Sequence, residues 1–140
     1  LADNRLKNPS YNFDSAAGID YTVDITRPRG EKITITSLSD GTPFNPDSTY
    51  TVAVNSYRAN GGGDLLTLGA GIPADELSSR VVRATDKDLR YYLIKAVEKR
   101  GVISPRVETN WRFVPEKLAS EAGRRSRHLL FGAGASRNQK

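Results

Sequence analysis

Three consecutive glycines, at positions 61–63, are the feature that most constrains how this chain folds. They follow a stretch in which Tyr50, Val52 and Val54 alternate with polar or small residues, and this period of two predicts a strand over residues 50–56. Adjacent glycines add nothing to a core, but they allow positive φ and a close approach of the backbone to another group. Because Tyr57 lies between the strand and the loop, the pattern favours a small-molecule pocket over a plain turn.

The remaining periodicity predicts an α+β fold. Alternating residues predict strands over 19–25 and 33–36, which form a hairpin, and a last strand over 109–114 that ends at Pro115. The main helix is expected to begin with Thr85 as N-cap and Asp88 in its first turn, and to end at Gly101. We therefore predict a mostly antiparallel or mixed sheet packed with one main helix.

Length and composition limit the functional classes. A chain of 140 residues is long enough for one domain with a core. It has no cysteine, which excludes disulfides and thiolate metal sites, and it has neither a Met nor a visible signal peptide, so we interpret it as a piece of a longer or processed protein. The net charge of +5 is concentrated near the end, and we expect residues 116–140 to be a basic, flexible tail after a domain at residues 1–115.

The residue types of a self-sufficient enzyme are missing. The single histidine, His128, lies in the basic tail, where nothing nearby suggests a nucleophile–base pair. The acidic pairs Asp75/Glu76 and Asp86/Asp88 are better explained as loop and helix-start residues than as paired catalytic acids. We expect neither catalysis nor a bound metal in this chain alone.

Binding is the better interpretation of the glycine loop. Aromatic rings stack on nucleobases, and a sandwich needs two of them, so Tyr57 would be joined by Tyr11 or Phe13. The Asp64 carboxylate is suited to accept hydrogen bonds from ribose hydroxyls, and the backbone N–H groups of the glycines can approach a ligand closely.

Three pieces of the sequence resemble the C-terminal, substrate-binding domain of the 5′-nucleotidase family, which includes the 2′,3′-cyclic-nucleotide phosphodiesterase/3′-nucleotidases. They are YNFDSAAGIDYTVD at 11–24, GTPFNPDSTYTVAVNSYRANGGGD at 41–64, and the helix from Thr85 followed by NWRFVP. The resemblance covers roughly residues 9–115.

The resemblance implies a function in nucleotide hydrolysis. Family members carry an N-terminal metallophosphoesterase domain with two divalent metal ions, and their C-terminal domain stacks the nucleobase between two aromatic side chains. Carried onto this chain, Tyr57 is the second aromatic, and Tyr11, with Phe13 as the alternative, is the first. Gly61, Gly62 and Asp64 shape the ribose side. The family also implies a nucleotide or nucleoside ligand and a periplasmic, cell-surface or secreted location.

Two departures from the family pattern matter. The family loop reads G-G-D-G whereas this one reads G-G-G-D, so Asp64 is displaced by one residue and Asn60 or Asn55 could take its place. The strand and helix that open the family domain are not in this chain, so we expect a truncated domain in which unpaired sheet edges favour an oligomer. Arg58 adjoins the predicted pocket, where it faces either phosphate or solvent.

Two other functions are compatible with the sequence. One is a basic nucleic-acid-binding module that uses the tail and Tyr91 and Tyr92; its binding would fall steeply with salt. The other is a structural dimerisation domain, which predicts no ligand.

Overall fold

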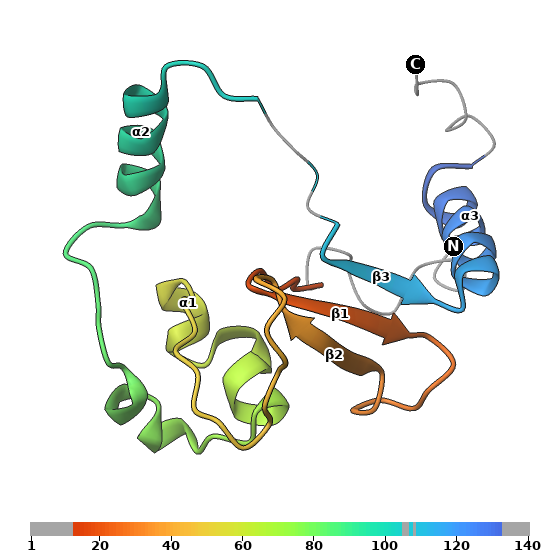
Figure 1. The fold of residues 1–140 in the computed structure, drawn as a ribbon, viewed down its shortest axis with the longest axis horizontal. Helices are drawn as coiled ribbons and strands as arrows, with labels where there is room; N and C mark the ends of the chain where they lie inside the picture. The colour runs from red at the N-terminus through yellow and green to blue at the C-terminus, as the bar shows by residue number, and fades with distance from the viewer. Residues whose placement is uncertain (1–12, 105–106, 108, 133–140) are drawn as a thin grey trace. The chain divides into compact units, whose positions relative to one another are not determined.

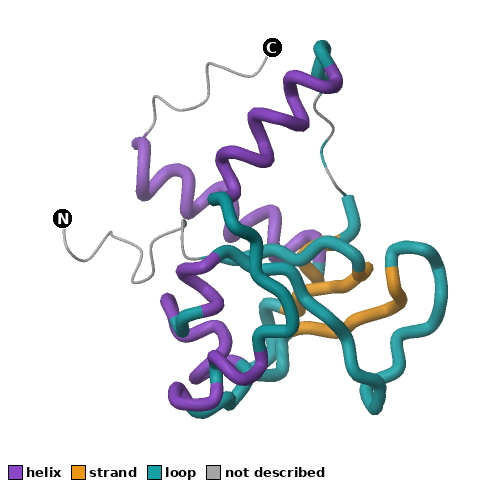
Figure 2. Tube along the Cα trace, turned by 90° about the vertical axis from the view of Figure 1, so that its left-hand side faces the viewer, coloured by secondary structure: helices purple, strands orange, loops and turns teal. Residues whose placement is uncertain are grey.

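The computed structural model describes residues 13–104, 107 and 109–132. The chain divides into two compact units, one built from residues 1–47 and 107–140 and the other from residues 48–106. We call them the sheet unit and the glycine-loop unit. Figure 1 shows the ribbon of both, and Figure 2 marks the strands and helices along the trace.

A three-stranded mixed sheet is the centre of the sheet unit. Its strands are β1 (Ile19–Asp24), β2 (Ile33–Leu38) and β3 (Trp111–Val114), in the order β2-β1-β3. β1 pairs antiparallel with β2, as the predicted hairpin requires, and parallel with β3. The helix α3 (Glu116–Phe131) follows β3 directly after Pro115. The α+β class is therefore confirmed.

One face of this sheet is apolar. Tyr21 and Val23 of β1 are buried, and they lie beside Trp111 and Phe113 of β3 in the ladder. The Tyr21 and Trp111 rings stack with centroids 5.9 Å apart, and Trp111 meets Phe113 edge to face at 5.1 Å. Such aromatic pairs stabilise a fold beyond the area they bury. Trp111 is half-buried within this cluster.

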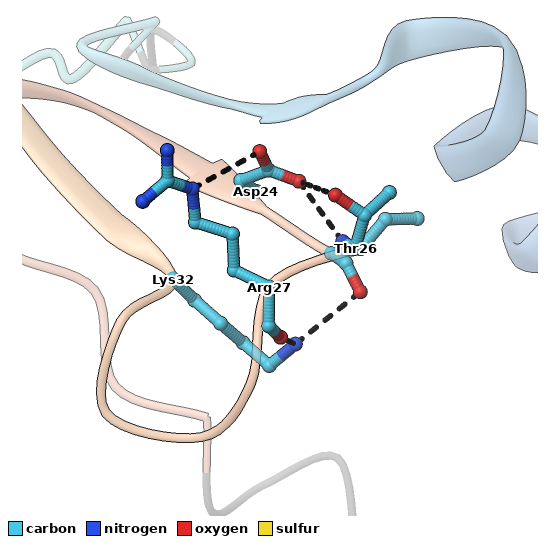
Figure 3. Close-up of polar contacts among 5 residues, drawn as sticks. Asp24, Thr26, Arg27 and Lys32 are labelled. Atoms are coloured by element: carbon cyan, nitrogen blue, oxygen red, sulfur yellow. Dashed lines mark hydrogen bonds and ion pairs between the residues drawn. The ribbon is translucent and has the colours of Figure 1, made fainter.

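The turn between β1 and β2 is fixed by a polar network (Figure 3). The Asp24 carboxylate accepts hydrogen bonds from the Thr26 hydroxyl at 2.6 Å and the Thr26 backbone N–H at 2.9 Å, and Arg27 lies 3.7 Å away. Lys32 donates to the backbone carbonyls of Ile25 and Arg27. The two Thr26 hydrogen bonds, the hydroxyl first, hold the pKa of Asp24 below its ordinary value because they stabilise the carboxylate.

The glycine-loop unit contains short helical segments and one longer helix. Two α-helices, α1 (Ser56–Ala59) and α2 (Leu89–Arg100), are joined by four single turns: η3 (Gly62–Asp64), η4 (Leu65–Gly69), η5 (Ala74–Glu76) and η6 (Ser78–Arg80). Leu77 is the buried residue of this unit among those described.

Three expectations about these elements are wrong. Residues 50–55 form no ladder, and their apolar side chains are exposed, because alternation makes a strand only where a partner strand is available. α2 begins after Asp88 rather than Thr85, since Asp88 accepts the Tyr91 N–H at 2.8 Å whereas the Thr85 hydroxyl donates to Lys87. There is a second long helix, α3, over residues 116–131, where we expected a flexible tail.

The end of α2 is confirmed, because Gly101 closes the helix at φ 73° and its N–H bonds the Val97 carbonyl. The apolar side chains along α2 are not buried: Leu89, Leu93 and Val97 are 62%, 56% and 44% exposed. None of the described helices is long and apolar enough to cross a membrane.

Candidate functional site

The candidate site is the segment from Asn55 to Asp64. Asn55 caps α1, because its backbone is extended and its side-chain oxygen accepts the Arg58 N–H at 2.9 Å. This cap starts a helix where the strand was predicted to continue. Tyr57 and Arg58 therefore project from the first turn of a short helix rather than from a strand end.

Tyr57 lies against the glycine loop and stays open to solvent. A Cβ built on Gly62 would lie 2.5–2.6 Å from three neighbouring ring carbons of Tyr57, Cδ2, Cε2 and Cζ. Near-equal distances to adjacent ring atoms mean that the backbone approaches the face of the ring and not its edge. Tyr57 is nonetheless 63% exposed. Gly62 thus supports one side of an exposed aromatic ring, and any side chain at position 62 would displace that ring.

Arg58 closes over the same loop. Its Nη1 donates to the Gly62 carbonyl at 2.9 Å, and its guanidinium carbon lies 5.3 Å from the centre of the Tyr57 ring. A Cβ on Gly63 would come within 1.6 Å of Nη1. The guanidinium therefore fills the space that a side chain at position 63 would occupy. Its predicted role in facing phosphate stays a prediction.

The structure explains why glycine occupies position 61. Its φ is 88°, in the left-handed region that favours glycine, and a Cβ there would approach buried Leu77 at 3.1 Å. The glycine lets the chain turn directly over the small apolar centre of this unit, so the loop is anchored at its first residue.

Asp64 ends the loop in a strained conformation. Its φ is 60°, and it is the one residue other than glycine with positive φ in the described part of the chain. Its N–H donates to the Gly61 carbonyl at 3.2 Å, which closes the turn, while the residue is exposed. Asn60 is exposed at the C-terminal end of α1, and its N–H bonds the Ser56 carbonyl. Both polar residues are thus placed beside Tyr57 by backbone hydrogen bonds.

The structure brings together six of the eight predicted site residues within one short segment: Tyr57, Arg58, Asn60, Gly61, Gly62 and Asp64. Phe13 belongs to the sheet unit, where its ring contacts Trp111 at 5.3 Å and Phe113 at 5.8 Å. Tyr11 lies outside the described residues. The identity of the second stacking ring therefore stays a prediction. Gly63 was not among the predicted site residues, but its lack of a side chain leaves room for the Arg58 guanidinium. The sequence signal for this contact is the arginine five residues before Gly63.

A hollow lies in the sheet unit, over the strand ends. It has a volume of about 550 Å³, and its lining includes Asp20, Thr36, Asn110 and Arg112. The side-chain amide of Asn110 donates hydrogen bonds to the Ala16 and Ile19 carbonyls, so it holds the segment that leads into β1. None of the predicted site residues that the structure describes lines this hollow.

Metal chemistry has no candidate among the described residues, which contain no group of three or more His, Cys, Asp or Glu side chains placed to hold an ion. The geometry of the glycine loop is suited to binding through a ring face, backbone groups and one carboxylate.

Comparison with known proteins finds one matching family model and several curated relatives. Residues 2–69 match the model of the family described as 5′-nucleotidase, C-terminal domain. Over these residues the chain is similar to the C-terminal domain of the 5′-nucleotidases. The matched residues include β1, β2 and the glycine loop, so the candidate site lies within the part that defines the family.

The curated relatives are bacterial nucleotide phosphoesterases. The chain is 29% identical over 117 residues to the trifunctional nucleotide phosphoesterase protein YfkN of Bacillus subtilis, covering 76% of this chain and 8% of YfkN. It is 32% identical over 121 residues to the 2′,3′-cyclic-nucleotide 2′-phosphodiesterase/3′-nucleotidase of Haemophilus influenzae, covering 76% of this chain and 17% of the relative. The protein of the same name from Salmonella typhimurium gives 32% over 122 residues. No solved structure matches the chain significantly.

The chain therefore spans 8–17% of the length of these relatives, which are multidomain hydrolases. The resemblance to the family that the sequence motifs indicated is confirmed.

Proposed function

We propose that this chain is the substrate-recognition part of a nucleotide phosphoesterase and that the exposed Tyr57 ring is the surface on which a nucleobase stacks. The observation that carries the proposal is the contact between Gly62 and the ring face. It leaves Tyr57 63% exposed while it restricts the ring from behind. Preorganising an aromatic side chain in this way lowers the entropy that is lost when a flat ligand binds.

The polar groups around the ring suit the rest of a nucleoside. Asp64 and Asn60 are exposed beside Tyr57 and offer oxygen acceptors to ribose hydroxyls. A second aromatic ring, from Tyr11 or Phe13, would complete the sandwich. Arg58 stays within reach of an anionic group, although its guanidinium already donates to the loop.

Hydrolysis in this proposal belongs to another domain. The relatives are several times longer than this chain, and we assign the chemistry to a metallophosphoesterase domain carrying two divalent metal ions. This chain would position the substrate so that its phosphate reaches those ions, and such positioning lowers the entropic part of the barrier. We place the protein in the periplasm, at the cell surface or outside the cell.

The test is a calorimetric titration of adenosine and of AMP into the chain, with Tyr57→Ala and Tyr91→Ala as matched variants. Loss of one stacking partner costs about 1–3 kcal/mol, so Tyr57→Ala should weaken binding by roughly 5- to 150-fold. Tyr91 is also an exposed tyrosine of the glycine-loop unit, on α2, so its removal should leave the affinity unchanged. Equal losses in both variants, or saturable binding that Tyr57→Ala leaves intact, would refute the stacking assignment.

Salt separates this proposal from nucleic-acid binding. The affinity for a neutral nucleoside should change little between low and moderate salt, whereas contacts with a phosphate backbone weaken steeply. A strongly salt-dependent affinity for single-stranded nucleic acid, with none for adenosine, would favour the basic-module alternative.

A further inference from the structure

The helix α3 has a charge distribution that nucleotide recognition does not explain. Its 16 residues, EKLASEAGRRSRHLLF, contain four Lys or Arg and two Glu side chains, and three of the arginines fall within Arg124–Arg127. No residue of α3 is buried. Figure 1 shows the helix following β3 at the end of the described chain.

One side of α3 is an exposed apolar band. With 3.6 residues per turn, Leu118, Ala122 and Leu129 fall on one side of the helix, and Ala119 and Leu130 widen the same band. Leu118, Leu129 and Leu130 are 45%, 37% and 48% exposed. These three leucines are therefore partly open to solvent at both ends of the helix.

Basic residues lie on both borders of this band. By the same helical period, Arg125 adjoins Leu118 and Leu129 on one border and Arg127 lies beyond Leu130 on the other. Lys117 and Arg124 lie on the opposite, polar side. Arginine side chains at such borders can extend their guanidinium groups outward while their stems cover apolar surface.

We propose that α3 binds the surface of a bilayer that contains anionic lipids, lying flat with its leucine band below the phosphate level and Arg125 and Arg127 among the headgroups. A helix with a basic polar side, an apolar side and low overall hydrophobicity has the properties of an interfacial helix. This proposal does not depend on nucleotide binding by the glycine loop.

Charge and shape favour this partner over two others. A nucleic-acid backbone would engage the basic residues but leave the leucine band uncovered. A second copy of α3 packed through the same band would bring the bordering arginines of both helices together, and like charges repel. An anionic bilayer matches both features at once.

The experiment is co-sedimentation of the full chain with phosphatidylcholine vesicles that do or do not contain phosphatidylglycerol. The chain should bind the anionic vesicles and not the zwitterionic ones. Arg125→Gln/Arg127→Gln should weaken binding roughly 20- to 30-fold, because each basic residue near an anionic surface contributes about one factor of five. Leu118→Gln/Leu129→Gln should weaken it by at least about tenfold while keeping every charge.

The matched control is Lys99→Gln/Arg100→Gln in the last turn of α2, which removes the same charge from another exposed helix. Circular dichroism checks that each variant keeps its helix content. The proposal is overturned by equal binding to both kinds of vesicle, by leucine variants that bind like the parent chain, or by a control that loses as much as the α3 arginine variant. It is also overturned if single-stranded DNA binds to the arginines and competes with the vesicles for them, or if the leucine change dissociates a dimer.

Discussion

Adding a single methyl group at Gly62 tests whether the loop backbone sets the position of the Tyr57 ring. In Gly62→Ala the new Cβ would lie 2.5 Å from the ring, whereas ordinary contacts begin at 3.4 Å, so the ring must move by roughly 1 Å or rotate away. Gly62 does not have the positive φ of its neighbours, so the change adds contact without backbone strain.

The stability cost of this change should be small. Tyr57 is 63% exposed and has room to rotate into solvent, and alanine reduces the freedom of the unfolded chain by about 0.4–1 kcal/mol relative to glycine. We therefore expect the free energy of unfolding to change by less than about 1 kcal/mol. The affinity for adenosine should instead fall toward that of Tyr57→Ala, a loss of about 1–3 kcal/mol.

Gly71→Ala is the matched control. Gly71 has φ 70° and no atom within 4 Å of its Cβ position, so its replacement introduces strain of about 1–2 kcal/mol but no contact. The assays are urea unfolding, adenosine calorimetry and the NMR resonances of the Tyr57 ring. If Gly62→Ala leaves those resonances and the affinity unchanged while Tyr57→Ala abolishes binding, the reasoning about the backbone support is wrong. If Gly71→Ala lowers affinity equally, general destabilisation is the cause.

Three further predictions concern single side chains. Asp64→Gly should relieve the strain of the positive φ at that residue, so the free energy of unfolding should stay equal or rise by up to about 1 kcal/mol. Ribose-containing ligands should bind more weakly to this variant. A lower free energy of unfolding with unchanged affinity would contradict both the backbone strain and the ribose contact. Because the pKa of the Asp24 carboxyl is lowered in the fold, the stability that its hydrogen bonds contribute is complete above pH 3.8 and is lost as the pH falls through the lowered pKa. In Thr26→Val the melting temperature should therefore fall less steeply at acid pH than in the parent chain. An unchanged fall would contradict this assignment. The hydrogen bond to Asp86 raises the pKa of the Tyr92 hydroxyl above 10.0, so the stability that this bond contributes is present below that pH and is lost as the pH rises through the raised pKa. In Asp86→Asn, titration of the tyrosine absorbance should show the pKa of Tyr92 returning toward 10.0.

Much of the fold follows from local patterns in the sequence. The alternation in residues 19–25 and 33–36 predicts a hairpin that the structure contains, and Trp111 begins the last strand inside the predicted range. Gly101 ends α2 as predicted because its positive φ of 73° is disfavoured for most other residues. These features depend on neighbours in the chain, which the sequence shows directly.

Whether a strand finds a partner, and which of two residues caps a helix, depends on contacts that the periodicity of the sequence does not show. Residues 50–55 have a strand pattern but no ladder partner, and the Asn55 cap starts a helix at Ser56. Thr85 and Asp88 are both good N-caps, and the choice between them depends on which side chain reaches the next turn. In α3 the amphipathic period is present, but a concentration of arginines led to the expectation of a flexible tail.

The same distinction applies to the candidate site. That three glycines permit a close backbone approach is a sound inference, yet two of the groups that approach belong to the chain itself. Gly62 receives the Tyr57 ring and Gly63 receives the Arg58 guanidinium, both from the short helix just before the loop. The candidate site is therefore built on an internal contact, because α1 and the loop contact one another through these two side chains.

This internal contact also explains why the loop reads G-G-G-D where the family pattern reads G-G-D-G. An aspartate at position 63 would place its Cβ 1.6 Å from Nη1 of Arg58, so the flexible guanidinium would have to move away from the Gly62 carbonyl. With Arg58 bonded to the Gly62 carbonyl, the first position where a carboxylate fits is 64, and the backbone there takes φ 60°. Aspartate tolerates that conformation better than most residues. The glycine at position 63 thus lets Arg58 keep its hydrogen bond to the Gly62 carbonyl, and the acidic residue follows one position later.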